Sequence, residues 1–530
     1  MSADVSKSEG QNWLHVPRKT KVRIAYTGLA ILVLAALVVP LAIKNWPFRY
    51  EKVQPMLESV FASKITIDRY HTTYFPHPGF VAEGMTMRRN TAPDLPPIGS
   101  ADALTMQGNW LDLLLLRKRI HLVEARGLHV VIPPVGSRAN HEDFPPGSSS
   151  DFAGPKTVVE TFHLQDATMD IMRDEGGRYS FPIHDLLIHN LKSGQAISYE
   201  VDMQNAKPTG RIQAHGSFGP VTPHNLGGTP LSGDFVFSPV NLGDIGKLHG
   251  TMSAQGHFTG RLADIEANVT SHTPDFAVSR GTPTDVSATA QATINGLNAD
   301  VVLHTIEART GRTVVHAGGA IMGSPKVTNL DIEVTKGRAE DLLRPFLHKQ
   351  PPVAGFVWMK SHANVAPGKT GVKFLDRLRM DGGFEVPAQR ITNFSVEKKL
   401  TAFSARAQGA GSNEGEAGNP QDAAADVVSS LAGRATIRHG VLSTDRLTFE
   451  VPGAVANLKG TYNFRGGAVH LTGDMKMDAD ISHATTGFKS ALLKPLAPFF
   501  KKKKAGAVVP IAVTGVPHQY KVVQNLLHTK

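Results

Sequence analysis

The chain has 530 residues, of which 41% are hydrophobic and 19% are charged, a composition typical of a folded protein with several domains or one long repetitive one. It contains no cysteine, which excludes disulfide scaffolds, cysteine-ligated zinc, iron–sulfur clusters and thiol catalysis. The formal net charge of +10 is spread along the chain, without a basic helix or alternating basic and aromatic residues, so we expect no nucleic-acid binding.

The first element along the chain is an apolar segment, Ile24–Ile43. It holds no charged side chain and is long enough to cross a hydrocarbon layer of about 30 Å as a helix. Basic residues precede this segment and aromatic residues follow it, namely Arg18, Lys19, Lys21 and Arg23 before it and Trp46, Phe48 and Tyr50 after it. Because basic flanks stay in the cytoplasm, we expect residues 1–23 to form a cytoplasmic tail, 24–43 a single-pass anchor in a bacterial inner membrane, and the rest to lie in the periplasm.

A cleaved signal peptide is the alternative interpretation of this segment. Signal-peptide cores are shorter, at about 7–15 residues, and end in an Ala-x-Ala pattern. The segment ends instead in the sequence Val39-Pro40-Leu41-Ala42-Ile43-Lys44. The sequence therefore favours a retained anchor.

Residues 44–135 predict a short helix followed by strands. In Glu51–Ser63 the apolar residues recur at helical spacing, and from Ile65 and Ile67 onward they alternate with polar neighbours instead. Later in this region an apolar run is followed by a basic turn and two more strands, at Trp110–Leu116, Arg117–Arg119, Ile120–Val123 and Leu128–Ile132, respectively.

A long central region of strands, 157–407, lies between two segments of loop composition. Prolines, serines and glycines predict a linker at 136–156, and a polar stretch predicts a loop at 408–426. The first strands expected after the linker are Thr157–Leu164, Ala167–Arg173, Phe181–His189, Ala196–Met203, Arg211–Phe218 and Gly233–Phe237.

The C-terminal region, 427–530, shows the alternation most regularly. Turns at Pro452-Gly453 and Arg465-Gly466-Gly467 separate strands with one apolar and one polar face, which predicts an antiparallel meander. The apolar side chains are either the core between two sheets or the open inner face of a concave sheet that accepts acyl chains, and periodicity does not distinguish the two. The candidate lipid-contacting residues are Leu447, Phe449, Val451, Leu458, Tyr462, Phe464, Val469, Leu471, Met475 and Met477.

One sharp cluster of positive charge lies close to the C-terminus. Four lysines, Lys501, Lys502, Lys503 and Lys504, follow a mildly amphipathic stretch that ends in Phe499 and Phe500. These residues fit a contact with anionic lipid headgroups, and they fit a solvated loop before a strand at Val508–Val513 equally well.

Motifs of catalysis and cofactor binding are missing from the sequence. Gly243–Leu248 superficially resembles a phosphate-binding loop, but Leu248 stands where a hydroxyl residue would hold magnesium, so we expect a glycine-rich turn. The 23 histidines are scattered and predict no metal site. We therefore expect no catalytic residue, no cofactor and no metal, and a protein that is not an enzyme.

Several stretches resemble the AsmA-like family. Phe80–Met85, Ala101–Leu104 and Trp110–Leu116 look like its N-terminal region, and its C-terminal region is similar to Val451–Ala454, Leu458–Tyr462, Thr485–Ser490 and Val509–Gly515. The resemblance implies an inner-membrane-anchored protein with an elongated, twisted antiparallel β-sheet groove and few short helices, of the bridge-like lipid-transfer type. It also implies a role in outer-membrane lipid homeostasis.

We therefore expect a mainly β protein that binds or transfers phospholipid or another acylated lipid along an apolar groove. Roughly 25 strands at about 4.8 Å spacing give a groove on the order of 120 Å long, which is short for bridging two membranes alone. The alternative is a non-catalytic assembly or scaffolding factor, which would bind outer-membrane proteins or brace the envelope through exposed sheet edges.

Overall fold

The computed structural model describes residues 46–391, 428–477 and 508–524, apart from gaps at 62, 91, 93, 135–136, 140–157, 173–176, 193, 222–224, 246, 349, 352, 369–371, 517–518 and 520. The predicted anchor at 24–43 and the predicted polar loop at 408–426 lie outside the described residues. Among the helices that are described, none combines the length and the apolar character needed to cross a membrane.

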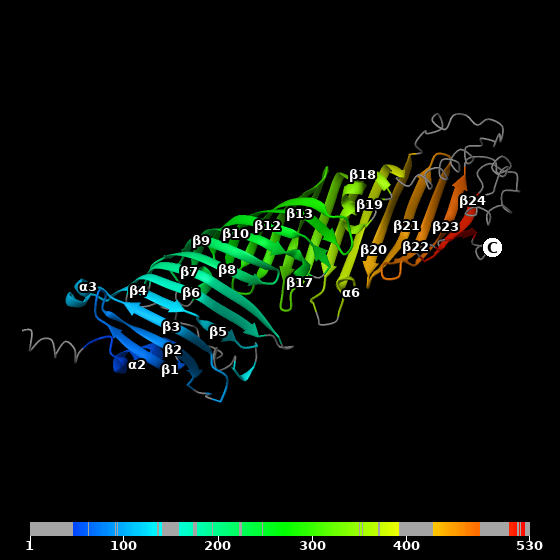
Figure 1. Cartoon of the computed structure of the whole chain (residues 1–530). Helices are drawn as coiled ribbons and strands as arrows, with labels where there is room; N and C mark the ends of the chain where they lie inside the picture. The colour runs from blue at the N-terminus through cyan, green and yellow to red at the C-terminus, as the bar shows by residue number, and fades with distance from the viewer. Residues whose placement is uncertain are drawn as a thin grey trace, which may run out of the picture.

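The molecule is an elongated, twisted β-sheet with a few short helices (Figure 1). Its helical elements are α2 (Tyr50–Phe61), α3 (Trp110–Leu114), α5 (Ala339–Leu343) and α6 (Phe374–Arg377), with 3-10 turns η1 (Leu226–Gly228), η2 (Leu242–Asp244) and η3 (Arg344–Phe346). Its strands are β1 (Ser63–Thr73), β2 (Gly79–Arg89), β3 (Gly99–Gln107), β4 (Arg119–Arg126), β5 (His129–Ile132), β6 (Val158–Met172), β7 (Arg178–Leu191), β8 (Ile197–Ala206), β9 (Thr209–Phe218), β10 (Pro230–Asn241), β11 (Leu248–His249), β12 (Thr251–Arg261), β13 (Asp264–Val278), β14 (Thr284–Asn295), β15 (Asp300–Thr310), β16 (Thr313–Met322), β17 (Val327–Arg338), β18 (Val353–Val365), β19 (Leu378–Ile391), β20 (Ser429–Arg438), β21 (Val441–Val451), β22 (Ala454–Asn463), β23 (Val469–Met477), β24 (Val508–Gly515) and β25 (Lys521–Gln524).

Twenty-four of these strands form one sheet in which neighbours in the chain are neighbours in space. The exception is the two-residue β11, which pairs beside the end of β13, so that β10 and β12 lie next to each other. The predicted loops interrupt the chain but not the sheet, because β19 pairs with β20 across the gap in the described residues. The mainly β character that the alternation predicted is confirmed.

One junction corrects the prediction of a purely antiparallel sheet. β4 and β5 act as one strand broken at Gly127, and both pair in parallel with β6. Parallel neighbours require the chain to return along the full length of the strand before the next one starts. β5 ends at Ile132 and β6 begins at Val158, so the segment of loop composition separates these two parallel strands in the sequence.

Local predictions near the N-terminus have mixed outcomes. The helix expected at Glu51–Ser63 is α2, and the turn expected around Gly243 is η2. The separate strands expected at Thr157–Leu164 and Ala167–Arg173 are one strand, β6, which continues through Asp166 in a left-handed conformation. Asp tolerates that conformation better than most residues, so the strand bulges there instead of ending.

A break in the alternation keeps apolar side chains on one face of β2. Phe80 and Ala82 are buried on the same side as Met85 and Met87, although an unbroken strand would place them on opposite sides. Gly84 lies between the two pairs with a φ of 66°, and neither Gly84 nor Asp68 opposite it is paired in the otherwise continuous β1–β2 register, so the alternation is reset at this position. The break therefore lets both halves of the strand contribute to one core.

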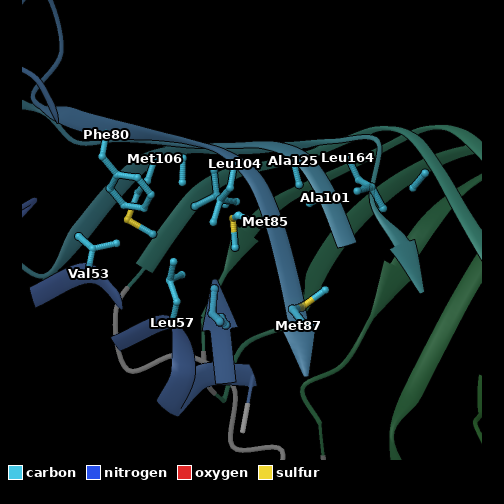
Figure 2. Close-up of a cluster of buried hydrophobic side chains, with 14 of the residues drawn as sticks. Val53, Leu57, Phe80, Met85, Met87, Ala101, Leu104, Met106, Ala125 and Leu164 are labelled. Atoms are coloured by element: carbon cyan, nitrogen blue, oxygen red, sulfur yellow. The ribbon is translucent and has the colours of Figure 1, made fainter. Parts of the chain in front are cut away.

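That core lies beneath the first strands of the sheet, where α2 packs against the curved sheet (Figure 2). Val53 and Leu57 of α2 are almost fully buried against Ile65, Phe80 and Met85. Burial of each such side chain contributes roughly 1.5–3 kcal/mol, which is enough to hold a helix that would be unstable alone. The N-terminal end of the sheet thus has an ordinary two-layer core.

Candidate functional site: the apolar face of the sheet

One apolar face continues from this core along the rest of the sheet. The strand register places residues of successive strands directly opposite each other, and the residues on one side are almost all apolar or glycine. In the middle of the sheet one such row runs Ala214, Phe235, Gly256, Val269, Ala290, Ile306, Ala317 and Ile332 from β9 to β17. We refer to this side of the sheet as the apolar face and to the other side as the polar face.

The apolar face is half-buried beyond the N-terminal core. On β13 the side chains from Asp264 to Pro274 alternate between exposed and half-buried or buried, starting with Asp264 exposed and Ile265 half-buried. Among the described residues, α5 packs at the margin of this face against Val334 and Val357, and no second sheet covers it. The partial burial therefore comes from side chains of neighbouring strands shielding one another.

The C-terminal strands carry nine of the ten candidate residues on this face. The strand register pairs Leu447 with Leu458 and Tyr462 with Val469. Ala456 lies between Phe449 of β21 on one side and Met475 of β23 on the other. The nine residues are Leu447, Phe449, Val451, Leu458, Tyr462, Val469, Leu471, Met475 and Met477. The prediction that they share a face is thereby confirmed, and their contact with lipid stays a prediction.

For the tenth candidate, Phe464, no strand register assigns a face, so its place on the apolar face stays a prediction. It follows the end of β22 in the turn towards β23, is exposed, and packs edge-on against Tyr462 with 5.2 Å between ring centroids. A strand's alternation ends where its ladder ends, so the sequence pattern extended one residue too far. The proposed headgroup contacts at Phe499, Phe500 and 501–504 lie outside the described residues.

Helix α2 closes the apolar face at its N-terminal end and also covers the first edge of the sheet. Besides burying Val53 and Leu57, it directs two polar side chains to the backbone of Ile65 in β1. The amide of Gln54 donates to the Ile65 carbonyl at 3.1 Å, and the Ile65 N–H donates to the Glu58 carboxylate at 3.2 Å. The free hydrogen-bonding groups of this edge position are therefore satisfied within the chain.

The polar face carries cross-strand ion pairs between exposed side chains. Lys360 lies 3.7 Å from Glu333, and the His362 ring contacts the Asp331 carboxylate at 2.9 Å. These residues line a shallow, open depression of mixed charge, together with Arg434. Exposed pairs of this kind contribute about 0–1 kcal/mol each, so this face is best described as a hydrated surface.

The most buried charged group is Asp170 of β6. Its carboxylate accepts hydrogen bonds from Ser180 at 2.6 Å and Arg178 at 2.9 Å, and it contacts the His129 ring at 3.0 Å. Burial alone raises the pKa of this carboxyl, but the hydrogen bonds from Ser180 and His129 and the charge of Arg178 outweigh burial, so its pKa is lowered. Every oxygen of the carboxylate has a partner, so the group stabilises the junction of β5, β6 and β7.

No grouping of three or more histidine, aspartate or glutamate side chains suited to a metal ion occurs in the described part of the chain. What the apolar face offers is shape and surface: a strip of aliphatic and aromatic groups that water covers only in part. Covering such a surface with other apolar groups is favourable, because apolar area is then removed from water.

Sequence reasoning missed the apolar positions of the central strands. Phe235, Phe258, Met359 and Phe384 lie on the same face as the C-terminal candidates, but the candidate residues were confined to β21–β23. The signal was present as alternation in 233–237 and 254–260, weakened by the many glycines and alanines between the larger side chains. Register across strands, rather than alternation within one strand, identifies these residues.

No protein-family model matches this chain, and no curated protein matches it.

Proposed function

We propose that this protein binds or transfers phospholipid or another acylated lipid along the apolar face, from a position anchored in the inner membrane by residues 24–43. The observation that supports the proposal best is the apolar face itself, which continues over the described strands without a second sheet on it. The apolar face supports lipid binding independently of the resemblance to the AsmA-like family, which implies the same function.

The energetics of the apolar face suit a lipid. Shielding apolar surface from water contributes about 25 cal/mol per Å², or ~0.8 kcal/mol for each methylene of an acyl chain. A chain of ordinary length can thus gain several kcal/mol on the face, while the headgroup stays in water at the margin of the sheet. Small residues such as Ala290 and Ala317 leave room above the sheet between larger ones such as Phe235 and Phe258.

The length of the sheet bears on how lipid would travel. Twenty-four strands at about 4.8 Å spacing span on the order of 110 Å along the sheet. The proposal is therefore a conduit over part of an envelope, or a carrier that hands lipid to a partner, rather than a complete bridge.

The competing function is assembly or scaffolding through an exposed sheet edge. One observation counts against edge pairing at β1: Gln54 and Glu58 already occupy the backbone groups of Ile65 that an added strand would need. Among the described residues, only α2 at the N-terminal end and α5 at the margin pack on the apolar face. We therefore place lipid binding first.

Native mass spectrometry with lipid extraction tests the proposal on residues 44–530, which lack the apolar segment and so cannot retain lipid through it. We expect phospholipid to co-purify with the wild type. A folded protein free of lipid would contradict lipid binding and favour the scaffolding function.

A further inference from the structure

Exposed leucines gather at one end of the molecule, on and after α3. Leu111, Leu114, Leu115 and Leu116 are all exposed, and Leu116 is 88% exposed. The helix is inverted relative to an ordinary surface helix, because its buried side chain is Asp112 and its leucines face outward. A contiguous apolar patch of this kind on an otherwise polar surface marks an interaction site.

A second loop extends the patch. The connection from β1 to β2 and the connection that contains α3 lie at the same end of the strands. Gly79 of β2 pairs there with Gln107 of β3, and the Gly108 N–H donates to the Pro78 carbonyl at 2.7 Å. Phe75 in the first connection is 89% exposed. We call Phe75, Leu111, Leu114, Leu115 and Leu116 the leucine tip.

The backbone holds Leu116 in place at a conformational cost. Leu116 has a φ of 52°, in the left-handed region that costs a residue with a side chain about 1–2 kcal/mol. Asn109 caps α3 through the Leu111 N–H at 3.0 Å, and the Arg117 N–H donates to the Asp112 carbonyl at 2.8 Å. These contacts fix a turn that leaves the Leu116 side chain in solvent. No packing within the described chain offsets the conformational cost of this turn.

Charge and aromatic rings next to the leucine tip point to the kind of partner. Arg117 and Lys118 follow Leu116 directly and are exposed. The Trp46 ring lies 5.5 Å from that of Trp110 and 5.1 Å from that of Tyr74, measured between centroids. Leucines flanked by basic residues and by tryptophan and tyrosine are the composition of segments that lie in the headgroup region of an anionic bilayer.

The chain places this patch beside the predicted anchor. Trp46 follows Ile43 by three positions, a stretch that spans at most about 11 Å. If residues 24–43 cross the bilayer, Trp46 and the rings that contact it are held at its surface. We propose that the leucine tip inserts into the interface of the anionic bilayer in which the chain is anchored, and so fixes the N-terminal end of the sheet against the membrane. The proposal rests on the anchor and not on lipid binding by the apolar face.

The absence of cysteine in the chain makes a direct test possible. Leu115→Cys in the full chain carries an environment-sensitive fluorophore, and the protein is reconstituted in vesicles of phosphatidylethanolamine with one quarter phosphatidylglycerol. Leu297→Cys, in the turn between β14 and β15, is the matched control because Leu297 is 55% exposed and Leu115 53% exposed. A third position, Leu41→Cys, reports on the anchor separately.

In the vesicles we expect severalfold higher fluorescence from the label at position 115 than from the label at position 297, and strong quenching by spin-labelled acyl chains at 115 only. Adding Arg117→Gln and Lys118→Gln should reduce the quenching at 115. A label at 115 that stays in water while the label at 41 is quenched would overturn the proposal and assign the leucine tip to a protein partner. Equal quenching at 115 and 297 would also overturn it, because the contact would then not be specific to the tip.

Discussion

Leu447 of β21 lies directly opposite Leu458 of β22, and both side chains are half-buried with no second sheet among the described residues to cover them. In a sandwich, a pair in this position would be sealed by the facing sheet. Here the pair belongs to an apolar surface that is partly exposed to water. Apolar residues lie opposite each other in the same way along the rest of the sheet.

Leu458→Asp should remove bound lipid from residues 44–530 while leaving the sheet folded. A half-buried leucine contributes about 1–2 kcal/mol, so the melting temperature should fall by a few degrees only. Native mass spectrometry measures the lipid, and circular dichroism measures the fold. Asn457→Asp is the control, because Asn457 is exposed on the polar face of the same strand, and it should retain lipid. Unfolding of the Leu458→Asp variant would show instead that this face is a dry core.

Leu57→Ala should loosen the N-terminal end of the sheet. Leu57 is 3% exposed beneath β1 and β2, and truncating a buried leucine costs roughly 2–5 kcal/mol. Hydrogen exchange of the β1 and β2 amides should become faster than in the wild type. Val60→Ala on the outer side of α2, where the side chain is 69% exposed, should leave exchange unchanged. Equal rates of amide exchange in the two variants would mean that α2 does not stabilise the N-terminal end of the sheet.

Gly84→Ala should also destabilise β2, for a reason in the backbone. The φ of 66° costs a residue with a Cβ about 1–2 kcal/mol, and the added carbon would overlap the Asp68 carboxylate. Gly466→Ala is the matched change, because a Cβ there meets no atom within 4 Å. Thermal unfolding should show a lower midpoint for the first variant and no change for the second. No difference between them would argue against the break in the alternation at Gly84.

The lowered pKa of Asp170 makes part of the stability depend on pH. A carboxyl with a pKa lower in the folded than in the unfolded state stabilises the fold above its unfolded pKa, which is about 3.9, and this contribution is lost as the pH falls through the folded value. Asp170→Asn should therefore be less stable than the wild type at about pH 5, with the difference shrinking toward about pH 2.

Thermal melts of both proteins across this range test the pH prediction. Asp185→Asn is the control, since Asp185 pairs with His163 at 2.6 Å but is half-exposed, so it should cost no more than about 1 kcal/mol. A constant difference between the wild type and Asp170→Asn at every pH would show that the buried carboxylate has no lowered pKa.

Alternation along single strands predicted much of the fold and a part of the candidate site. Strands such as β22 and β23 were predictable because one face is apolar and the other polar over nine or ten residues. Phe464 was predicted to continue a strand that ends at Asn463, because alternation carries no signal for the end of a ladder. The parallel pairing of β4 and β6 was not predictable either, since it depends on a long return segment whose route the local pattern does not encode.

By itself, the sequence determined that the chain is rich in strands with two unlike faces, because side-chain direction alternates strictly along an extended backbone. It also determined that a short helix precedes the first strand. Only the tertiary structure decided that the apolar faces of β6–β25 lie in one sheet instead of two facing each other, and that α3 turns its leucines outward. Strand partners and helix orientation arise from contacts between residues far apart in the chain, and a periodic pattern is the same whether its apolar side meets another sheet, a lipid or water.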